Sequence, residues 1–201
     1  MTAIIDYKAG NLTSVKLAFA ALGVETVVTS DPEVIAAADR VVFPGVGAAK
    51  SAMENLRALG LAESVKAAAA TKPFLGICLG MQILFDHSEE DGGVDCLGII
   101  PGRVRRFPSV LGFKVPEIGW NSCETAAPGG AVRREEYYFV HSYYAEVVPE
   151  TVGLTEYAGV TFTSMVRKGA LLACQFHPEK SGRVGLRLIR GWLEGGKGGV
   201  P

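Results

Sequence analysis

The segment that most constrains the fold is PFLGICLGMQ, residues 73–82. An apolar run leads into Gly76-Ile77-Cys78-Leu79-Gly80, and residues compatible with a helix follow at once. This pattern of glycine, any residue, nucleophile, any residue, glycine predicts a sharp turn from strand to helix, because glycine tolerates a crowded backbone that a Cβ would block. Such a turn exposes the Cys78 side chain above the carboxyl edge of a sheet.

Strand-like and helix-like segments alternate through the first half of the chain. Strands are expected at AIIDY (3–7), ETVVT (25–29), RVVFPGVG (40–47) and PFLGI (73–77). Helical spacing is found in LTSVKLAFAAL (12–22), PEVIAAA (32–38) and an alanine-rich region over residues 49–70, and a further helix is expected from Leu79 to His87. The alternation predicts an α/β protein with a mostly parallel open sheet flanked by helices.

The pattern changes after about Cys96. Shorter strand-like pieces are separated by proline and glycine, at LGIIPGRVRRF (97–107), YYFVHSYYAEVV (137–148) and TFTSMVRKG (161–169), with a turn at APGG (127–130). They predict an added region of antiparallel strands in the second half. The chain closes with LLACQFHPE (171–179) and an amphipathic helix through Val184, Leu188 and Trp192. We expect one domain over residues 1–195 and a flexible tail over 196–201.

Composition excludes several classes of function. The 201 residues are 48% hydrophobic and 20% charged, with a formal net charge of −1, so no basic surface is expected for nucleic acid or an anionic membrane. No apolar run reaches the roughly 18 residues of a membrane span, and no export signal opens the chain. The four cysteines show neither CxxC pairs nor zinc-like spacing. We expect a cytoplasmic protein with reduced thiols and no metal.

Cys78 is in a setting that favours a nucleophile. Backbone N–H groups and the positive end of the dipole at a helix N-terminus stabilise a thiolate, which is the reactive form. The N–H of Leu79 would then bind an oxyanion that develops on an attacked carbonyl. A second donor is expected from the loop PGVG (44–47), at Val46 or Gly47, because this loop follows a strand that ends at the same sheet edge.

A thiol nucleophile needs a base, and His177 is the best candidate. It ends an apolar strand in the motif HPE, where Glu179 follows two residues later and can fix the tautomer of the imidazole. His87 is expected near the end of the helix after Cys78, too far along to reach back. His141 alone is more typical of an ordinary strand histidine. The residues therefore predict a triad of Cys78, His177 and Glu179.

GICLGMQ, QFHPEKS and PGVG together resemble the signatures of the class I, triad-type glutamine amidotransferases. DYKAGNLTSV, VPEIGWN and YFVHSYY narrow the resemblance to the glutaminase subunits of imidazole glycerol phosphate synthases, over residue 4 to about residue 193. The resemblance implies a flavodoxin-like fold and a reaction in which the Cys78 thiolate attacks the side-chain amide of glutamine. It implies that His177 protonates the leaving ammonia and that water hydrolyses the γ-glutamyl thioester to glutamate.

The resemblance also implies a partner. The family passes ammonia through a tunnel to a (βα)8-barrel synthase subunit, which closes the imidazole ring in histidine biosynthesis, and the two chains form a heterodimer without a metal or a redox cofactor. Family position implies that glutamine is bound by Gln82, Glu90, His141, Ser142 and Tyr143. It also implies partner-facing positions at Asn11, Trp120, Asn121, Tyr138 and Lys180.

Two residues depart from the family pattern. Lys8 stands where DYGxGN has glycine, and Glu117 stands where VPHxGWN has histidine. Neither residue belongs to the triad, so we expect both departures to bear on the partner-facing surface and to leave the glutaminase chemistry unchanged.

Three other interpretations remain open from the sequence. A glutaminase for anthranilate, guanylate or pyridoxal phosphate synthesis would share the triad and would lack the GNL, GWN and HSYY segments. A cysteine hydrolase of the α/β-hydrolase type would share the turn at Cys78, but there the acid precedes the histidine in the chain. The third is a binding subunit with a vestigial site, in which Cys78 would not react with an electrophilic glutamine analogue.

Overall fold

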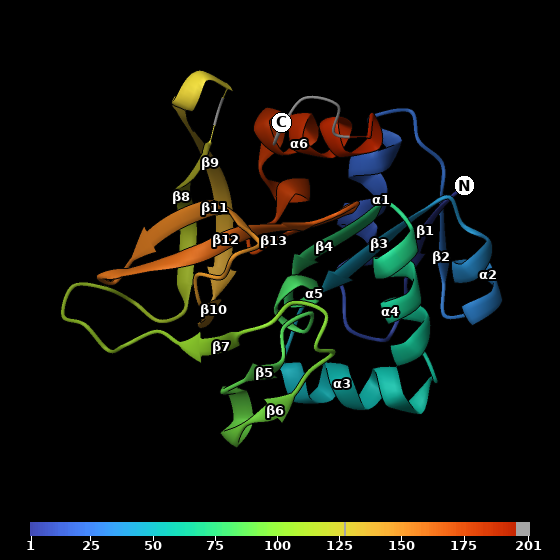
Figure 1. The fold of residues 1–201 in the computed structure, drawn as a ribbon, viewed down its shortest axis with the longest axis horizontal. Coiled ribbons are helices and arrows are strands. Elements are labelled where there is room, and N and C mark those ends of the chain that lie inside the picture. The colour runs from blue at the N-terminus through green and yellow to red at the C-terminus, as the bar shows by residue number, and fades with distance from the viewer. Residues whose placement is uncertain (127, 196–201) are drawn as a thin grey trace.

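The computed structural model describes residues 1–126 and 128–195. All thirteen strands of these residues join one hydrogen-bonded sheet, and helices cover both of its faces (Figure 1). The α/β class with a mostly parallel open sheet, expected from the sequence, is confirmed. No helix within these residues is long and apolar enough to cross a membrane.

The parallel half of the sheet has the strand order β2-β1-β3-β4-β13. Its strands are β1 (Thr2–Ile5), β2 (Thr26–Thr29), β3 (Arg40–Gly45), β4 (Phe74–Cys78) and β13 (Leu171–Cys174). β13 enters from the far end of the sequence and lies parallel to β4, with Cys174 opposite Ile77. On the other side of β4, Gly45 at the end of β3 is opposite Cys78. Three segments distant in sequence therefore end at one sheet edge, beside Cys78.

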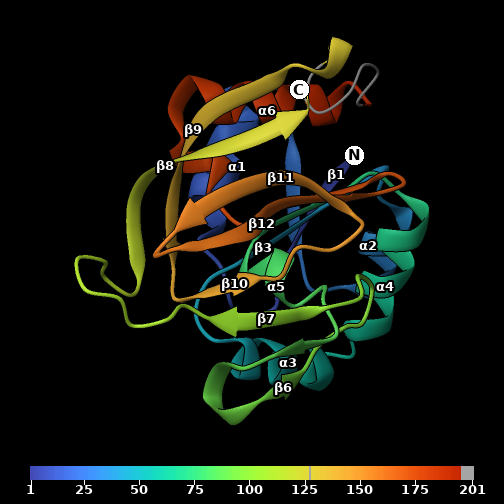
Figure 2. The same ribbon diagram turned by 60° about the vertical axis from the view of Figure 1, so that its left-hand side comes forward.

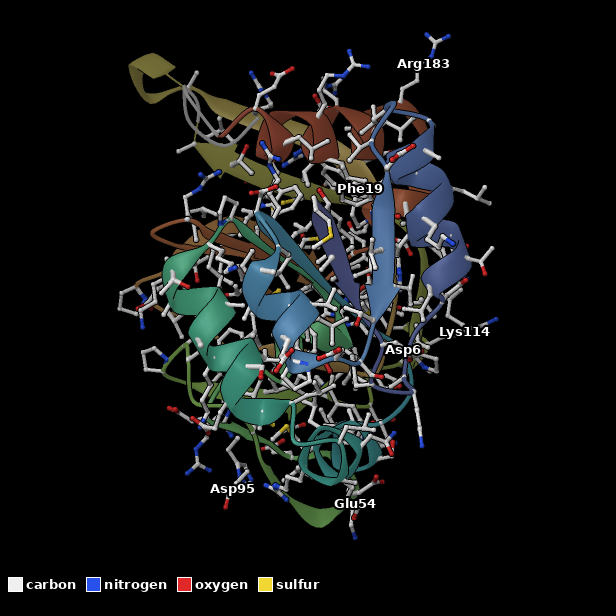
Figure 3. The ribbon with its side chains drawn as sticks, turned by 90° about the vertical axis from the view of Figure 1, so that its right-hand side faces the viewer. Asp6, Phe19, Glu54, Asp95, Lys114 and Arg183 are labelled. Carbon is white, nitrogen blue, oxygen red and sulfur yellow. The ribbon has the colours of Figure 1, made fainter. Side chains whose placement is uncertain are left out.

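Side chains alternate between the two faces of these strands and form two cores. One core lies under α2 (Pro32–Ala37), α3 (Ala49–Ala58) and α4 (Ala62–Thr71) and includes Ile5, Phe43 and Ala173. The other lies under α1 (Leu12–Ala20) and α6 (Gly182–Leu193), where Phe19 meets Trp192 edge to face. In Figure 3 Phe19 points inward beneath these helices, while Arg183 extends outward from α6.

The antiparallel region continues the sheet from β13 through β12 (Val160–Lys168), β10 (Tyr143–Ala145) and β7 (Arg103–Arg106) to the short strands β5 (His87–Ser88) and β6 (Val94–Asp95). A long hairpin of β8 (Glu117–Ala126) and β9 (Val132–His141) pairs with β12 through β11 (Thr151–Tyr157). Figure 2 shows this hairpin arching along the top of the view beside α6. The expected added antiparallel region is thus confirmed.

The helix expected from Leu79 to His87 is wrong in length. Helix α5 (Leu79–Gln82) is a single turn, and His87 belongs to strand β5. The carbonyls of residues 83–86 accept hydrogen bonds from N–H groups of residues 96–100, so long-range pairing replaces the i to i+4 bonds of a longer helix. His87 is accordingly remote from Cys78, and its Nδ1 lies 3.0 Å from Asp95 Oδ1.

Two other expectations need adjustment. The helical region 49–70 is two helices, α3 and α4, because Gly60 adopts a left-handed conformation with φ of 66° that ends the first of them. Within the expected turn 127–130, Pro128–Gly130 forms a short 3₁₀ turn, and residue 127 lies outside the described residues. The expected tail, 196–201, also lies outside them.

Candidate active site

Cys78 occupies the sharp turn that its flanking glycines predict. Its backbone has φ of 54° and ψ of −114°, a conformation rare for a residue with a side chain, between the end of β4 and the start of α5. A Cβ on Gly80 would lie 1.9 Å from the carbonyl oxygen of Phe43, and one on Gly76 would lie 2.8 Å from the Cβ of Ala173. The close approach of β3 and β13 therefore requires glycine at both positions.

His177 and Glu179 form a buried pair at the end of β13. His177 Nδ1 donates to Glu179 Oε1 at 2.7 Å, and each side chain is 2% exposed. Strand β9 holds the turn from both ends, because His177 N donates to the carbonyl of Tyr138 at 2.9 Å, and Tyr138 N donates to Ser181 Oγ at 3.0 Å. Ser181 Oγ in turn donates to the His177 carbonyl at 2.6 Å. The imidazole is thus held in one orientation, with Nε2 free of any other partner in the described structure.

The surroundings of His177 favour its charged form. Burial alone would lower the pKa of the imidazole, but its interactions with the nearby Cys78 sulfur and with the Glu179 carboxylate outweigh burial and raise that pKa from 6.5 to about 10. The imidazole is therefore protonated at neutral pH, next to the sulfur of Cys78. A cation beside a thiol favours the thiolate.

These groups open into one cavity of about 330 Å³. It is lined by the expected catalytic, oxyanion and glutamine-binding residues together with Lys180: Val46, Gly47, Cys78, Leu79, Gln82, Glu90, His141, Ser142, Tyr143 and His177. Pro116 and Val140 complete the wall. Glu179 lies behind His177 and outside the lining. The structure thus brings together at one cavity the residues that the sequence placed in the site.

The loop 44–47 lies beside Cys78 because β3 and β4 are paired up to Gly45 and Cys78. Val46 is 38% exposed, and Gly47 has φ of 96°, which is open to glycine and strained for other residues. Tyr7 lies behind this loop, since a Cβ on Gly45 would be 2.3 Å from its hydroxyl oxygen. Val46 and Gly47 of this loop therefore line the cavity together with Leu79.

Gln82 is buried, with 5% of its surface exposed, and its side-chain amide is engaged in the protein. Gln82 Nε2 donates to the carbonyl of Tyr143 at 2.8 Å and to Gln175 Oε1 at 2.9 Å. These bonds tie α5 to β10 and to the end of β13. The amide oxygen of Gln82 is the polar atom left for a ligand.

Glu90 serves as a helix cap as well as a wall of the cavity. Its Oε2 accepts a hydrogen bond from the backbone N of Ala49 at 2.6 Å, at the start of α3, where no local side chain caps the helix. Partial burial, with a smaller contribution from Asp91, raises the pKa of the Glu90 carboxyl. The carboxyl group thus caps α3 through Oε2 and lines the cavity at the same time.

Glu117 is buried rather than partner-facing, which corrects the expectation for this departure. Its Oε2 lies 3.0 Å from His141 Nε2, and the two side chains are 4% and 3% exposed. His141 Nδ1 lies 2.7 Å from the Tyr143 carbonyl, which can only accept, so Nδ1 carries a proton. Glu117 and His141 therefore lock the start of β8 to the wall of the cavity.

The five positions expected to face a partner have different surroundings. Asn11 caps α1, because its side chain accepts a hydrogen bond from Ser14 N at 3.3 Å. Trp120 is 56% exposed and packs edge to face on Tyr138, so it is not a core residue. Asn121 donates to Glu117 Oε1 at 2.8 Å and to the Glu156 carbonyl at 3.0 Å, and Lys180 is exposed at the rim of the cavity.

Sequence reasoning missed two residues that touch this constellation, Ser181 and Gln175. Gln175 is fully buried, and its Nε2 lies 3.7 Å from the sulfur of Cys78. One signal could have found it, because a glutamine inside the apolar strand LLACQF is a buried polar group that needs a partner. Within residues 1–126 and 128–195 there is no cluster of three or more His, Cys, Asp or Glu side chains that could hold a metal ion.

Comparison with known proteins gives consistent results. A family model described as glutamine amidotransferase class-I matches residues 3–191. The imidazole glycerol phosphate synthase subunit HisH of Thiobacillus denitrificans is 47% identical, covering 93% of this chain and 88% of its own. The HisH subunit of Methylococcus capsulatus is also 47% identical, covering 95% and 94%.

A solved structure described as a glutamine amidotransferase has a TM-score of 0.75 at 20% identity, covering 97% of this chain and 98% of its own. At that identity the likeness concerns the fold alone.

Proposed function

The chain belongs to the class I glutamine amidotransferase family, and from that premise we propose that it is the glutaminase subunit of an imidazole glycerol phosphate synthase. In this role it hydrolyses glutamine to glutamate and ammonia and passes the ammonia to a synthase subunit in histidine biosynthesis. The observation that carries the proposal is the convergence of Cys78 and His177 at one cavity, from the ends of the adjacent strands β4 and β13, with Glu179 bonded to His177 from behind.

The proposed reaction begins with attack of the Cys78 sulfur on the side-chain carbonyl carbon of glutamine. The carbonyl oxygen takes the negative charge, and the backbone N–H groups of Leu79 and of the loop at Val46 and Gly47 stabilise it. Collapse of this intermediate breaks the C–N bond, and His177 gives its proton to the departing ammonia. The product bound to the protein is a γ-glutamyl thioester on Cys78.

Hydrolysis reverses the role of His177. The neutral imidazole accepts a proton from water as the water oxygen attacks the thioester, and glutamate leaves as the sulfur regains its charge. Glu179 supports both steps, because its carboxylate fixes the Nδ1–H tautomer and stabilises the imidazolium. We propose that Gln82, Glu90, Ser142 and Tyr143 hold the substrate through the cavity wall.

A partner surface is proposed at the mouth of the cavity. Ile118 and Trp120 lie on one face of β8 and are 63% and 56% exposed. They lie opposite Val140 and Tyr138 in the hairpin register, and Val140 lines the cavity. An exposed apolar patch joined to the site supports docking of the synthase barrel here, with Lys180 at the rim of the same cavity. We propose Asn11 as a further partner-facing residue.

We also propose one domain over residues 1–195, since one sheet joins all described strands. The four cysteines are free in the structure, which supports a reducing compartment, the cytoplasm.

The test is glutamate release from glutamine by this chain alone, and then with the barrel subunit and its nucleotide ligand. We expect strong activation that depends on the partner, loss of activity in Cys78→Ala, and no loss in Cys96→Ala, which changes a half-buried thiol elsewhere. If glutamate release does not change when the barrel subunit is added, the chain is a glutaminase but belongs to another amidotransferase. Inactivity under both conditions, together with no labelling of Cys78 by an electrophilic glutamine analogue, would favour a vestigial subunit.

A further inference from the structure

A fully buried glutamine lies next to the nucleophile, at the end of β13. Gln175 is 0% exposed, and its backbone N donates to the carbonyl of Ser164 at 2.9 Å, which fixes its main chain. Because Cys174 is opposite Ile77 in the parallel pair β13 and β4, the next residue of each strand places Gln175 beside Cys78. A buried primary amide carries two N–H donors and one carbonyl acceptor, and each needs a partner.

The hydrogen-bond network determines which end of this amide faces the sulfur. Gln82 contacts the Tyr143 carbonyl at 2.8 Å, and since that carbonyl can only accept, the contacting atom of Gln82 is its amide nitrogen. The same nitrogen lies 2.9 Å from Gln175, so the facing atom of Gln175 is its oxygen. The nitrogen of Gln175 is therefore the atom that lies 3.7 Å from Cys78 Sγ.

The sulfur has few other built-in donors. Helix α5 is a single turn, so the contribution of a helix dipole is small compared with that of the longer helix expected from the sequence. Besides the neighbouring His177 imidazole, the sulfur accepts no hydrogen bond from another side-chain amide or hydroxyl in the described part of the chain, and the Val140 carbonyl at 4.0 Å is an acceptor. A donor from Gln175 therefore matters most when the sulfur is charged.

We propose that Gln175 is a further catalytic residue, whose side-chain N–H donates to the Cys78 sulfur and stabilises the thiolate, with Gln82 as the positioning residue that holds the amide in this orientation. The inference deepens the proposed function, because it rests on Cys78 as the nucleophile. Once the sulfur is bonded to the γ-glutamyl carbon it is uncharged, and the same N–H binds it less strongly. Gln175 thus stabilises the Cys78 thiolate, which attacks glutamine and which hydrolysis of the thioester regenerates.

The test measures the thiolate without using glutamine. Iodoacetamide alkylates Cys78 by displacement of iodide, and the rate in the full chain is followed from about pH 5 to about pH 9 by mass spectrometry of the Cys78 peptide. Gln175→Glu keeps the oxygen that Gln82 binds and turns an anionic oxygen toward the sulfur, whereas Gln175→Met keeps the volume and has no donor. We expect alkylation near neutral pH to fall about tenfold in both variants, with the midpoint moved to higher pH.

Controls separate a loss of the donor from a loss of the fold. Fully buried Cys174 stays unlabelled in a folded chain, and half-buried Cys96 provides a reference rate in the same digest. Gln82→Met should slow alkylation less than Gln175→Met, because it frees the Gln175 amide without removing it. If Gln175→Met, with Cys174 protected, reacts at the rate and pH midpoint of the parent, the inference is wrong.

Two further outcomes distinguish this inference from the proposed function. If the Gln175 variants lose glutamate release but keep the alkylation profile of the parent, the proposed glutaminase function is retained. The inference that Gln175 stabilises the Cys78 thiolate is then wrong. If Cys78 in the parent chain is no more reactive than Cys96, both the proposed nucleophile and its support by Gln175 are overturned.

Discussion

At the scale of single residues, the buried pair of His177 and Glu179 gives the sharpest prediction. Glu179→Gln keeps the size of the side chain, removes the charge that stabilises the imidazolium, and offers an N–H that favours the wrong tautomer. We expect the pKa of His177, raised to about 10, to fall, and partner-stimulated glutamate release to drop on the order of 10²–10⁴-fold. The measurements are an NMR titration of the imidazole and steady-state kinetics.

The matched control for this change is Glu135→Gln. Glu135 accepts from Arg187 at 2.7 Å on the surface, so it is also a carboxylate in an ion pair, but outside the cavity. The glutaminase rate of the Glu135→Gln variant should equal that of the parent. A Glu179→Gln enzyme as fast as the Glu135→Gln enzyme would remove Glu179 from the proposed mechanism.

The backbone conformation at Lys8 explains why the family pattern has glycine at this position. It also predicts that lysine lowers the stability of the chain. Lys8 has φ of 63°, in the left-handed region where a Cβ is unfavourable and glycine is at ease. We expect Lys8→Gly to raise the free energy of unfolding by about 0.5–1 kcal/mol, as measured by urea denaturation. Lys50→Gly, in the ordinary helical backbone of α3, should lower it by a similar amount. Equal losses in the two variants would contradict the strain at Lys8.

The residue scale also shows what the sequence can and cannot predict. Cys78, His177 and Glu179 were found because their motifs carry both the chemistry and the local geometry, in a turn between glycines and in a histidine before proline. Gln175 and the contact of Glu117 with His141 were missed, because they depend on which strands become neighbours. No pattern within residues 171–176 states that β13 will lie against β4.

At the scale of elements, α6 controls the position of the triad turn. A Cβ on Gly185 would lie 1.8 Å from the carbonyl oxygen of Pro178, in the turn that carries His177 and Glu179. We expect Gly185→Ala to push helix and turn apart, to lower the free energy of unfolding by about 1–3 kcal/mol and to reduce glutamate release. Arg183→Ala, on the outer face of the same helix, should change neither quantity, as its outward position in Figure 3 indicates.

The measurements for Gly185→Ala are chemical denaturation and the glutaminase assay with the partner present. A variant with the stability and the activity of the parent would show that α6 can shift without moving the turn, and that the close approach at Pro178 is not required.

Helix lengths were the weakest element-scale predictions, for an identifiable reason. The region 83–86 has apolar residues compatible with a helix, but its carbonyls pair with residues 96–100, and this long-range pairing shortens α5 to one turn. Gly60, in contrast, is visible in the sequence as a helix terminator between α3 and α4. Local sequence signals therefore predicted the first residues of helices better than their last residues, which depend on tertiary contacts.

At the scale of the whole molecule, the order of strands explains why a site can form from distant parts of the chain. β4 is central, with β3 on one side and β13 on the other, so the loop 44–47, Cys78 and the segment 175–179 meet at one edge. Binding at the carboxyl ends of parallel strands is general for open α/β sheets. The fold class was predictable from alternation, whereas the adjacency of β13 and β4 was not.

The free energy of unfolding of the whole chain should depend on pH through the buried imidazole of His177. The pKa of His177 is raised from 6.5 to about 10 in the folded chain, so between these values the native state holds a proton that the unfolded state has lost. The contribution of His177 is therefore fully present below about pH 6.5 and is lost as pH rises through about 10.

The measurement is the free energy of unfolding of the parent and of His177→Gln across that window, by urea denaturation at each pH. Groups that titrate equally in both proteins cancel in the difference. We expect the advantage of the parent over the variant to shrink on the alkaline side and to disappear above about pH 10. A difference that stays constant to that pH would mean that His177 is uncharged in the folded chain, and the proton that it is proposed to give to ammonia would need another source.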